Sequence, residues 1–227
     1  MNVIIACQTL RDEVEKALKD TGVKYPVLWI DSGLHNYPDK LKTKLQEQID
    51  RISNTENLIL VFGNCGNALN GIRATTGRLV LPKIDDCISL LLGSVQKRME
   101  ISREAHSYFL TCGWLAHESN IVKEHKRCLE KYGEVRGQKI FKAILAHYRK
   151  VILLDTNAYP LHEIEANVKR FAGDVGLDFQ VVPGTLSYLK KLFTGPWDED
   201  FIVVERGEKI TFEMFGFINQ NFLQISG

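Results

Sequence analysis

The sequence predicts an α/β protein with a mostly parallel sheet, or two such sheets in Rossmann-like lobes, covered by helices on both faces. Short apolar runs alternate with amphipathic segments along most of the 227 residues. The apolar runs are continuous and do not alternate with polar residues, which is typical of strands buried on both faces. The amphipathic segments between them predict the covering helices.

Eight apolar runs are predicted strands. They span residues 3–6, 26–30, 57–62, 79–82, 107–111, 150–154, 179–182 and 201–205. A (β/α)₈ barrel would also need eight strands, but the second and fifth runs are weak and a long helical segment follows the fifth. We therefore expect open sheets and no closed barrel.

Helices are predicted between these runs. The first spans residues 9–20, where Thr9 and Asp12 form a capping pattern and Gly22 is a stop signal. Residues 38–52 carry an apolar side chain at every fourth position, which predicts one buried stripe. The remaining predicted helices span residues 86–104, 161–172 and 186–193.

The chain divides into three stretches. We expect an N-terminal α/β lobe over residues 1–115, a helical insertion over 116–149 and a C-terminal α/β part over 150–227, with one continuous domain as the alternative. The insertion is rich in Lys and Glu and divides near Gly133. It predicts a peripheral hairpin, a lid or the contact of a homodimer.

Composition narrows the classes of function. The net charge of +1 gives no reason to expect nucleic acid or a membrane surface as a partner. No apolar run is long enough to span a bilayer. The first residues enter a strand without the basic segment and cleavage site of a signal peptide, so we expect a cytoplasmic location. Thiols stay reduced there, which favours metal binding or catalysis over disulfides.

Three of the five cysteines follow predicted strands, namely Cys7, Cys65 and Cys87. The carboxyl ends of parallel strands meet at one edge of a sheet, where ligand sites form. Soft thiolates select zinc or iron–sulfur clusters, so these cysteines are candidate metal ligands. If only three protein ligands bind, one position stays open and the site is catalytic in type. Cys112, after the fifth run, is an alternative fourth ligand.

Cys65 lies in a turn that is rich in Gly and Asn, over residues 63–71. Glycine lets the backbone approach a ligand closely, so the candidate cofactor-binding residues are Gly63, Asn64, Gly66 and Asn67. We expect this turn to open a helix, whose dipole lowers the pKa of the thiol. A plain strand-to-helix turn around a small buried cysteine is the alternative.

Asp86 and His35 are the candidate catalytic residues. Asp86 precedes Cys87 and is also a natural cap for the helix expected there. His35 follows the second predicted strand, where Asp31 is placed to orient its ring. A solvated or hydrogen-bonding histidine is the alternative. Two aromatic residues, Trp114 and Trp197, are candidates for the rim of the site or for ordinary packing.

Several segments in this order resemble the uncharacterised family known as domain of unknown function 1638. They read IIAC, DSGLHNYPDKL, FGNCGNALNGI, LPKIDDCISLLLGS, YFLTCGW and GTLSYLKKLFTGPWDEDFIVV. The resemblance extends over nearly the whole chain. It carries over to Cys7, His35, Cys65, Asp86, Cys87, Trp114 and Trp197, but Cys112 has no fixed counterpart. It implies an anaerobic one-carbon setting, because members occur in methanogens and other anaerobes near genes for corrinoid-dependent methyltransferases.

Three classes of function remain open. The first is a metal-dependent enzyme or accessory protein, such as a methyltransferase, with a small-molecule substrate and a corrinoid protein or methyltransferase as partner. Zinc on the three cysteines would activate a thiol for methyl transfer, whereas an iron–sulfur cluster would indicate corrinoid reduction or sulfur chemistry. The second is a metal-free enzyme with two thiols as acid and base, as in amino-acid racemases. The third is a module that binds a small ligand or a corrinoid.

Overall fold

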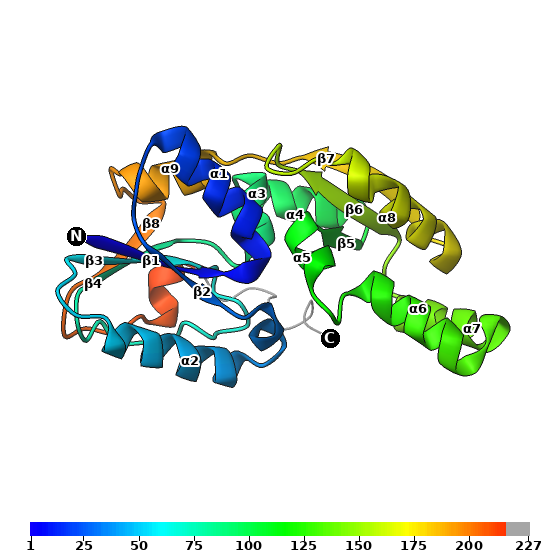
Figure 1. Ribbon diagram of the computed structural model, residues 1–227, viewed down its shortest axis with the longest axis horizontal. Coiled ribbons are helices and arrows are strands. Elements are labelled where there is room, and N and C mark those ends of the chain that lie inside the picture. The colour runs from blue at the N-terminus through cyan, green and yellow to red at the C-terminus, as the bar shows by residue number, and fades with distance from the viewer. Residues whose placement is uncertain (217–227) are drawn as a thin grey trace.

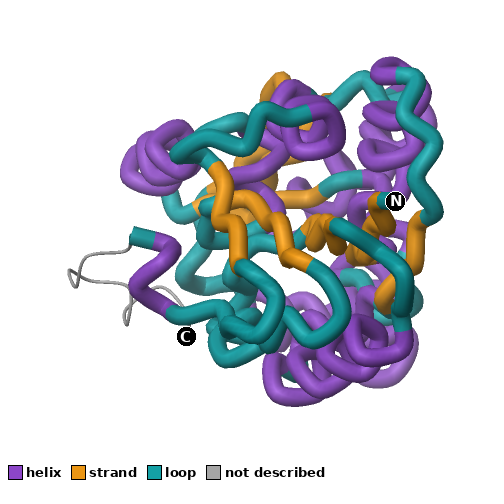
Figure 2. The backbone as a smooth tube through the Cα atoms, turned by 90° about the vertical axis from the view of Figure 1, so that its left-hand side faces the viewer, coloured by secondary structure: helices purple, strands orange, loops and turns teal. Residues whose placement is uncertain are grey.

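The computed structural model describes residues 1–216, which form two β-sheets with helices around them (Figures 1 and 2). The first sheet has the strand order β2-β1-β3-β4-β8 and the second has the order β5-β6-β7. Each predicted strand is present, which confirms the α/β class. The strands are β1 (Asn2–Cys7), β2 (Val27–Ile30), β3 (Asn57–Val61), β4 (Arg78–Pro82), β5 (Ser107–Leu110), β6 (Lys150–Asp155), β7 (Asp178–Pro183) and β8 (Phe201–Val204).

Strand pairing is parallel throughout both sheets except at β8, which runs antiparallel to β4. The chain builds the first four strands of one sheet, continues through the second sheet and then returns with β8 to the edge of the first. Thus β5 pairs within the second sheet although it precedes residue 115, and β8 belongs to the first sheet although it lies in 150–227.

Helices cover both faces of the first sheet, with α1 and α9 on one side and α2 on the other (Figure 1). None of the helices within residues 1–216 has the length and apolar character needed to cross a membrane. The helical segments are η1 (Gln8–Leu10), α1 (Arg11–Thr21), η2 (Ser32–Asn36), α2 (Pro38–Arg51), α3 (Cys87–Leu92), α4 (Val95–Glu104), α5 (Cys112–Ala116), α6 (Ile121–Tyr132), α7 (Glu134–Ile144), α8 (His162–Val175), α9 (Ser187–Thr194) and η3 (Phe212–Phe215).

The core of the first sheet follows from the alternation of side chains along its strands. In β1, Ile4 packs into the cluster that contains residues of α1 and α9, whereas Val3 and Ile5 pack into the cluster that contains the apolar stripe of α2. Successive side chains of a strand point to opposite faces, so a continuous apolar run fills both clusters. This pattern confirms burial on both faces for β1, β3 and β4, whereas the edge strands β2, β5 and β7 are only partly buried, so the prediction is wrong for them.

The single helix predicted over residues 86–104 is wrong, because the structure divides it into α3 and α4. Gly93 ends α3 in the left-handed conformation with φ of 77°, which suits glycine at a helix C-terminus. Ser94 then begins α4, since its side chain accepts a hydrogen bond from the backbone N–H of Lys97 at 3.2 Å. The sequence Gly-Ser thus ends one helix and begins the next.

The insertion forms the helical hairpin of α6 and α7, which projects from the second sheet (Figure 1). It divides at Gly133, as predicted, with φ of 76°. The helices pack so closely at Gly137 that a Cβ there would lie 2.8 Å from a methyl carbon of Leu129. Cys128 also lies in this contact, with its Sγ atom 3.9 Å from the carbonyl oxygen of Gly137.

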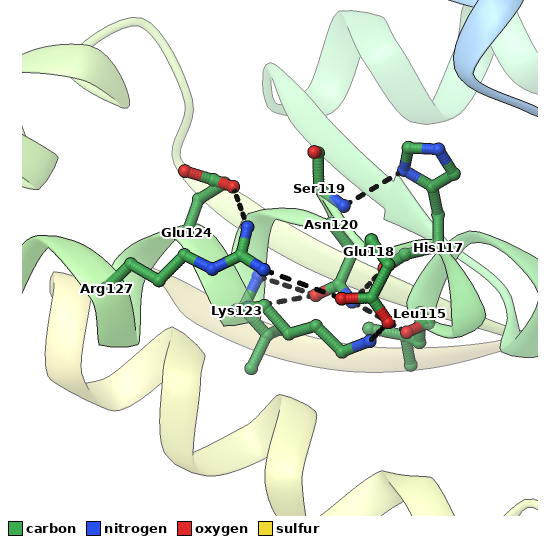
Figure 3. A network of polar contacts seen from close by, with 9 residues as sticks. Leu115, His117, Glu118, Ser119, Asn120, Lys123, Glu124 and Arg127 are labelled. Atoms are coloured by element: carbon green, nitrogen blue, oxygen red, sulfur yellow. Dashed lines mark hydrogen bonds and ion pairs between the residues drawn. The ribbon is translucent and has the colours of Figure 1, made fainter.

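Asn120 fixes the connection between α5 and α6 (Figure 3). Its side-chain amide donates to the carbonyl oxygens of Leu115 and His117, both at 2.7 Å. Its side-chain oxygen accepts from the first backbone N–H groups of α6. Nearby, Glu118 pairs with Lys123 across 3.3 Å, but exposed ion pairs of this kind contribute little stability. The buried amide therefore carries most of this connection.

Glu13 joins α1 to the second sheet. Its side chain is fully buried, and Oε1 accepts a hydrogen bond from Thr156, which follows β6, at 3.1 Å. Its other oxygen, Oε2, has no hydrogen-bond partner within residues 1–216. Burial raises the pKa of Glu13 to about 7, and Asp12 adds to this effect. The neighbouring Tyr159 and Cys112 are also titratable and also have raised pKa values.

Stability should therefore fall as the pH rises. Between the ordinary pKa of 4.5 and about 7, Glu13 keeps its proton only in the folded state, and above 7 the folded state loses it too. We expect Glu13 to contribute a drop of about 2–3 kcal/mol in the free energy of unfolding between pH 5 and pH 8. His35 and His125, whose pKa values are lowered, act in the opposite direction, so urea denaturation measures the Glu13 contribution as the difference between the pH profiles of the wild type and Glu13→Gln. The control Glu15→Gln, at an exposed position of α1, should keep the wild-type profile, and an unchanged profile in Glu13→Gln would contradict the assignment.

Candidate functional site

Three buried cysteines from three strand ends line one pocket. Cys7 ends β1, Cys65 lies in the loop after β3, and Cys87 begins α3 after β4. They are only 8%, 9% and 7% exposed. The pocket is small, with a cavity volume of about 10 Å³, which is room for about one water molecule. The rest of its wall consists of Thr9, Leu10, Asp31, His35, Leu41, Val61 and Phe62.

The order of the strands explains why these cysteines meet. β1, β3 and β4 are adjacent and parallel, so their carboxyl ends lie along one edge of the first sheet. Beyond the strands, the backbone amides of Asn64 and Cys65 donate to the carbonyl oxygens of Ile84 and Asp85 at 3.1 and 3.0 Å. These hydrogen bonds hold the Cys65 loop against the segment that leads to Cys87.

Burial governs the acidity of the three thiols. It raises the pKa of Cys7, Cys65 and Cys87, and the three groups also act on one another, since Cys7 further raises the pKa of both other thiols. Asp86 adds to the effect at Cys65 and Cys87. A cation among them would have the opposite effect.

Each thiol also has a hydrogen-bonding neighbour. The Thr9 hydroxyl donates to Cys7 Sγ at 3.1 Å, and hydrogen bonding from the Trp114 side chain lowers the pKa of Cys87. A backbone hydrogen bond at Gly63 does the same for Cys65. Donors of this kind favour the thiolate, which is the form that binds a metal.

The helix expected after Cys65 is absent, and this expectation is wrong. Cys65, Gly66 and Asn67 have φ values of 44°, 66° and 69°. Three successive left-handed residues cannot start a right-handed helix. Cys65 therefore lacks a helix dipole, and burial raises its pKa well above the ordinary value where the sequence predicted a lowered one. Left-handed conformations of non-glycine residues are costly and often occur at functional sites.

The four candidate cofactor-binding residues differ in their surroundings. A Cβ on Gly63 would lie 2.6 Å from Asp86 Cα, so packing alone explains this glycine. The side-chain amide of Asn64 donates to Asn67 Oδ1 at 2.9 Å. Asn64 Oδ1 is buried without a hydrogen-bond partner in the described part of the chain. Gly66 faces Pro38, with 3.3 Å between its ideal Cβ and the proline ring. Asn64 thus offers the free acceptor of this loop.

His35 lines the pocket and packs edge-on against Trp114, with 4.8 Å between the ring centroids and 87° between the planes. Burial lowers the pKa of His35, which favours the neutral ring. Asp31 also lines the pocket, but its Oδ1 accepts the backbone N–H of Gly33 at 2.8 Å. This contact shows Asp31 as a cap of η2.

Asp86 holds α3 in place through both carboxylate oxygens. Oδ1 accepts the backbone N–H of Ser89 at 2.9 Å, and Oδ2 pairs with the Arg98 guanidinium at 2.8 Å. Asp86 is not among the residues that form the described pocket wall, and neither is Cys112, which lies near Asp12. The structure therefore gives Asp86 a structural task beside the site.

Sequence reasoning missed two partners and left a third undecided. Thr9 appeared only as a helix cap, although its position two residues after Cys7 was a usable signal. Arg98 lies in the charged half of a predicted helix, and nothing there indicates its pairing with Asp86. Trp114 was predicted as a rim or packing residue, and its contacts with Cys87 and His35 arise between distant segments.

The side chains of the pocket are of the chemical type that binds a soft metal, but they are not arranged around a common point. Thiolates suit zinc or an iron–sulfur cluster, and His35 lies in the same wall. Within residues 1–216, however, no group of three or more His, Cys, Asp or Glu side chains is arranged to hold an ion as it stands. A metal would require the three thiol side chains to turn toward a common point.

Replacing Gly63 tests the backbone contact under the site. Gly63→Ala places a Cβ within 2.6–2.8 Å of Asp86 backbone atoms, so the free energy of unfolding should fall by about 1–3 kcal/mol. The matched control is Gly173→Ala in α8, which has no atom within 4 Å of the new Cβ. It should gain up to about 1 kcal/mol. Denaturant titration measures both, and equal effects would refute the contact.

Replacing Asp86 separates its structural task from a chemical one. Asp86→Asn keeps an acceptor for the cap of α3 but removes the carboxylate 2.8 Å from Arg98, so that only the more distant Asp85 carboxylate, at 3.9 Å, still pairs with it. We expect a loss of about 1–3 kcal/mol in unfolding free energy. The exposed control Asp39→Asn, in the first turn of α2, should stay within about 0.5 kcal/mol. Unchanged stability in Asp86→Asn would contradict the structural role and favour the prediction that Asp86 is a catalytic residue.

Comparison with known proteins identifies the family. The family model described as protein of unknown function, DUF1638, matches residues 29–193. The match includes His35, Cys65 and Cys87, whereas Cys7 precedes it. No curated protein and no solved structure matches the chain. Because the match extends over more than half of the sequence, the chain belongs to the DUF1638 family.

Proposed function

We propose that this protein is a metal-dependent enzyme or accessory protein in which Cys7, Cys65 and Cys87 hold a zinc ion or an iron–sulfur cluster. One observation carries the proposal: three buried thiols from three strand ends line a single pocket. Burying three separate cysteines for packing alone would not require a shared cavity. Thiolates are the ligands that these metals prefer.

The pocket supports catalysis on a small molecule. Three protein ligands leave one coordination position for a substrate. Leu10, Leu41 and Phe62 provide apolar walls that exclude water, and His35 is placed to take a proton from the substrate. The described wall contains neither Lys nor Arg, so it favours a neutral or cationic substrate group over an anionic one.

The reaction that we propose is activation of a small thiol for methyl transfer linked to a corrinoid. Zinc in this pocket would supply Lewis-acid activation of the thiol, and an iron–sulfur cluster would serve corrinoid reduction or sulfur chemistry instead. This reaction class comes from the resemblance to the family and its one-carbon setting. The pocket adds the open position and the apolar wall. A corrinoid protein or a methyltransferase is the partner that this reaction requires.

The alternative of a metal-free acid–base enzyme fits the geometry less well. Two thiols that act as acid and base face a substrate from opposite sides. Here Cys7, Cys65 and Cys87 all come from neighbouring strand ends of the first sheet. Cys112, which follows β5 of the second sheet, lies beside Asp12 and outside the pocket wall. The arrangement therefore favours convergence on one ion.

Metal content tests the proposal directly. Protein purified under strict anoxia should contain near-stoichiometric zinc, or iron with sulfide and a brown chromophore, by elemental analysis and absorption spectroscopy. Cys65→Ser and Cys87→Ser should each lose at least about tenfold in metal affinity, because one of three ligands is gone. Cys128→Ser is the matched control and should keep the metal, since Cys128 lies in α6, where that helix contacts α7 far from the pocket wall.

Two outcomes would overturn the proposal. One is a wild-type protein that binds neither zinc nor iron, even after anoxic reconstitution with each metal. The other is full metal content in both Cys65→Ser and Cys87→Ser. In either case, loss of activity or of small-ligand binding on alkylation of the thiols would then favour the metal-free enzyme or the binding module.

A further inference from the structure

Helix α5 follows a strand of the second sheet but contacts the thiol pocket at the edge of the first sheet. It follows β5 directly and lies between the two sheets, beside the start of α1 (Figure 1). Although it spans only Cys112–Ala116, it contacts three segments that carry pocket residues. These segments are η1 after β1, η2 after β2 and the start of α3.

The first contact joins the α5 backbone to η1. A Cβ on Gly113 would lie 2.0 Å from the carbonyl oxygen of Thr9 and 3.0 Å from its Cα atom. Only glycine permits this approach, so α5 rests directly on the main chain of Thr9. The hydroxyl of Thr9 in turn donates to Cys7 Sγ at 3.1 Å. The contact thus reaches the first thiol through one residue.

The second contact is made by the Trp114 side chain. Its ring packs against the cluster that contains Cys87, whose pKa it lowers as a side-chain donor, and it lies edge-on to His35 at 4.8 Å. Trp114 also packs against two hydrophobic clusters, one that includes Cys87 and one beneath the second sheet. A single side chain therefore contacts one candidate ligand and the candidate proton acceptor while it is anchored in both cores.

The third contact lies at the end of α5. His117 Nε2 is 3.3 Å from the ideal Cβ position of Gly33, which lies in η2 two residues before His35. His117 is held in turn, because its Nδ1 accepts the backbone N–H of Ser119 at 3.1 Å (Figure 3). The side-chain amide of Asn120 also binds the His117 carbonyl oxygen. The α5–α6 connection is therefore fixed against the loop that carries His35.

We propose that Trp114 is a positioning residue of the thiol pocket and that α5 sets the places of Cys7, Cys87 and His35 relative to one another. The proposal concerns the same pocket as the proposed function, but its contacts exist without a metal. It gives the second half of the fold a part in the site, because Trp114, in the helix that follows β5, completes the surroundings of a thiol at the edge of the first sheet.

The first test measures metal affinity in Trp114→Phe, which keeps an aromatic ring but lacks the indole N–H donor. Outer partners of metal ligands typically change affinity by 10–100-fold when removed, and we expect zinc or cobalt binding to weaken within that range in competition with a chelator. Trp29→Phe is the matched control, because Trp29 lies in β2 and stacks on Arg11 at 4.6 Å. Binding within twofold of the wild type in Trp114→Phe would contradict the role.

The second test needs no metal and keeps Trp114 in place. With fluorotryptophan in the chain, the signal of Trp114 is assigned by elimination using Trp29→Phe and Trp197→Phe. We expect its fluorine resonance to shift in His35→Gln and in Cys87→Ser but not in Cys128→Ser. The inference is wrong if the fluorine chemical shift of Trp114 stays the same in both His35→Gln and Cys87→Ser.

The two tests separate this inference from the proposed function. If the wild type binds no metal, the proposed function fails and the fluorine resonances alone decide the role of Trp114. If metal binds normally but Trp114→Phe and the resonances show no effect, the metal site stands and the positioning role fails. Trp114→Tyr replaces Trp114→Phe if circular dichroism shows that the latter does not fold.

Discussion

The main-chain contact between the loops after β3 and β4 is the constraint on which the pocket depends. The amides of Asn64 and Cys65 donate to the segment before Asp86, and Gly63 lies too close to that segment for any side chain. Because these contacts join main-chain atoms, they place Cys65 beside Cys87 independently of the side chains in the loop. The left-handed conformation of Cys65 costs on the order of 1–3 kcal/mol, which the two hydrogen bonds help to offset. The loop geometry is thus maintained against its own backbone preference.

The pocket also lies where two hydrophobic clusters meet. Cys7 and Cys65 belong to the cluster packed on the α2 face of the first sheet, whereas Cys87 belongs to the cluster on the α1 and α9 face. A sheet separates these clusters along its length, and they come together only beyond its carboxyl edge. The thiols are therefore buried by both clusters although they lie at the ends of secondary-structure elements or in a loop. This burial keeps water from the thiols and accounts for their raised pKa values.

The strands could be predicted from sequence because most are short apolar runs, and the central ones, β1, β3, β4 and β6, are buried on both faces. Long-range contacts could not. The pairing of β4 with β8 joins residues far apart in the chain, and no local pattern indicates that β5 starts a second sheet. The break at Gly93 had a readable signal, since Ser94 follows it, but the apolar run before it suggested one continuous helix. At the site, the meeting of the cysteines followed from the rule that parallel strands end at one edge of a sheet. The contacts of Trp114 and Arg98 join distant parts of the chain, and no spacing in the sequence indicates them.

The segment from Cys7 to Glu13 links the thiol pocket to two of the contacts between the sheets, beside the hydrophobic cluster that the two sheets share. Cys7 is followed by Thr9, whose backbone supports Gly113 of α5, and then by Glu13, whose carboxyl binds Thr156 beyond β6. A buried carboxyl with only one hydrogen-bond partner costs the fold free energy. Here it fixes α1, and with it the end of β1, to the second sheet. Any shift of the second sheet must therefore move the turn that carries Cys7, so the geometry of the thiols depends on both sheets together.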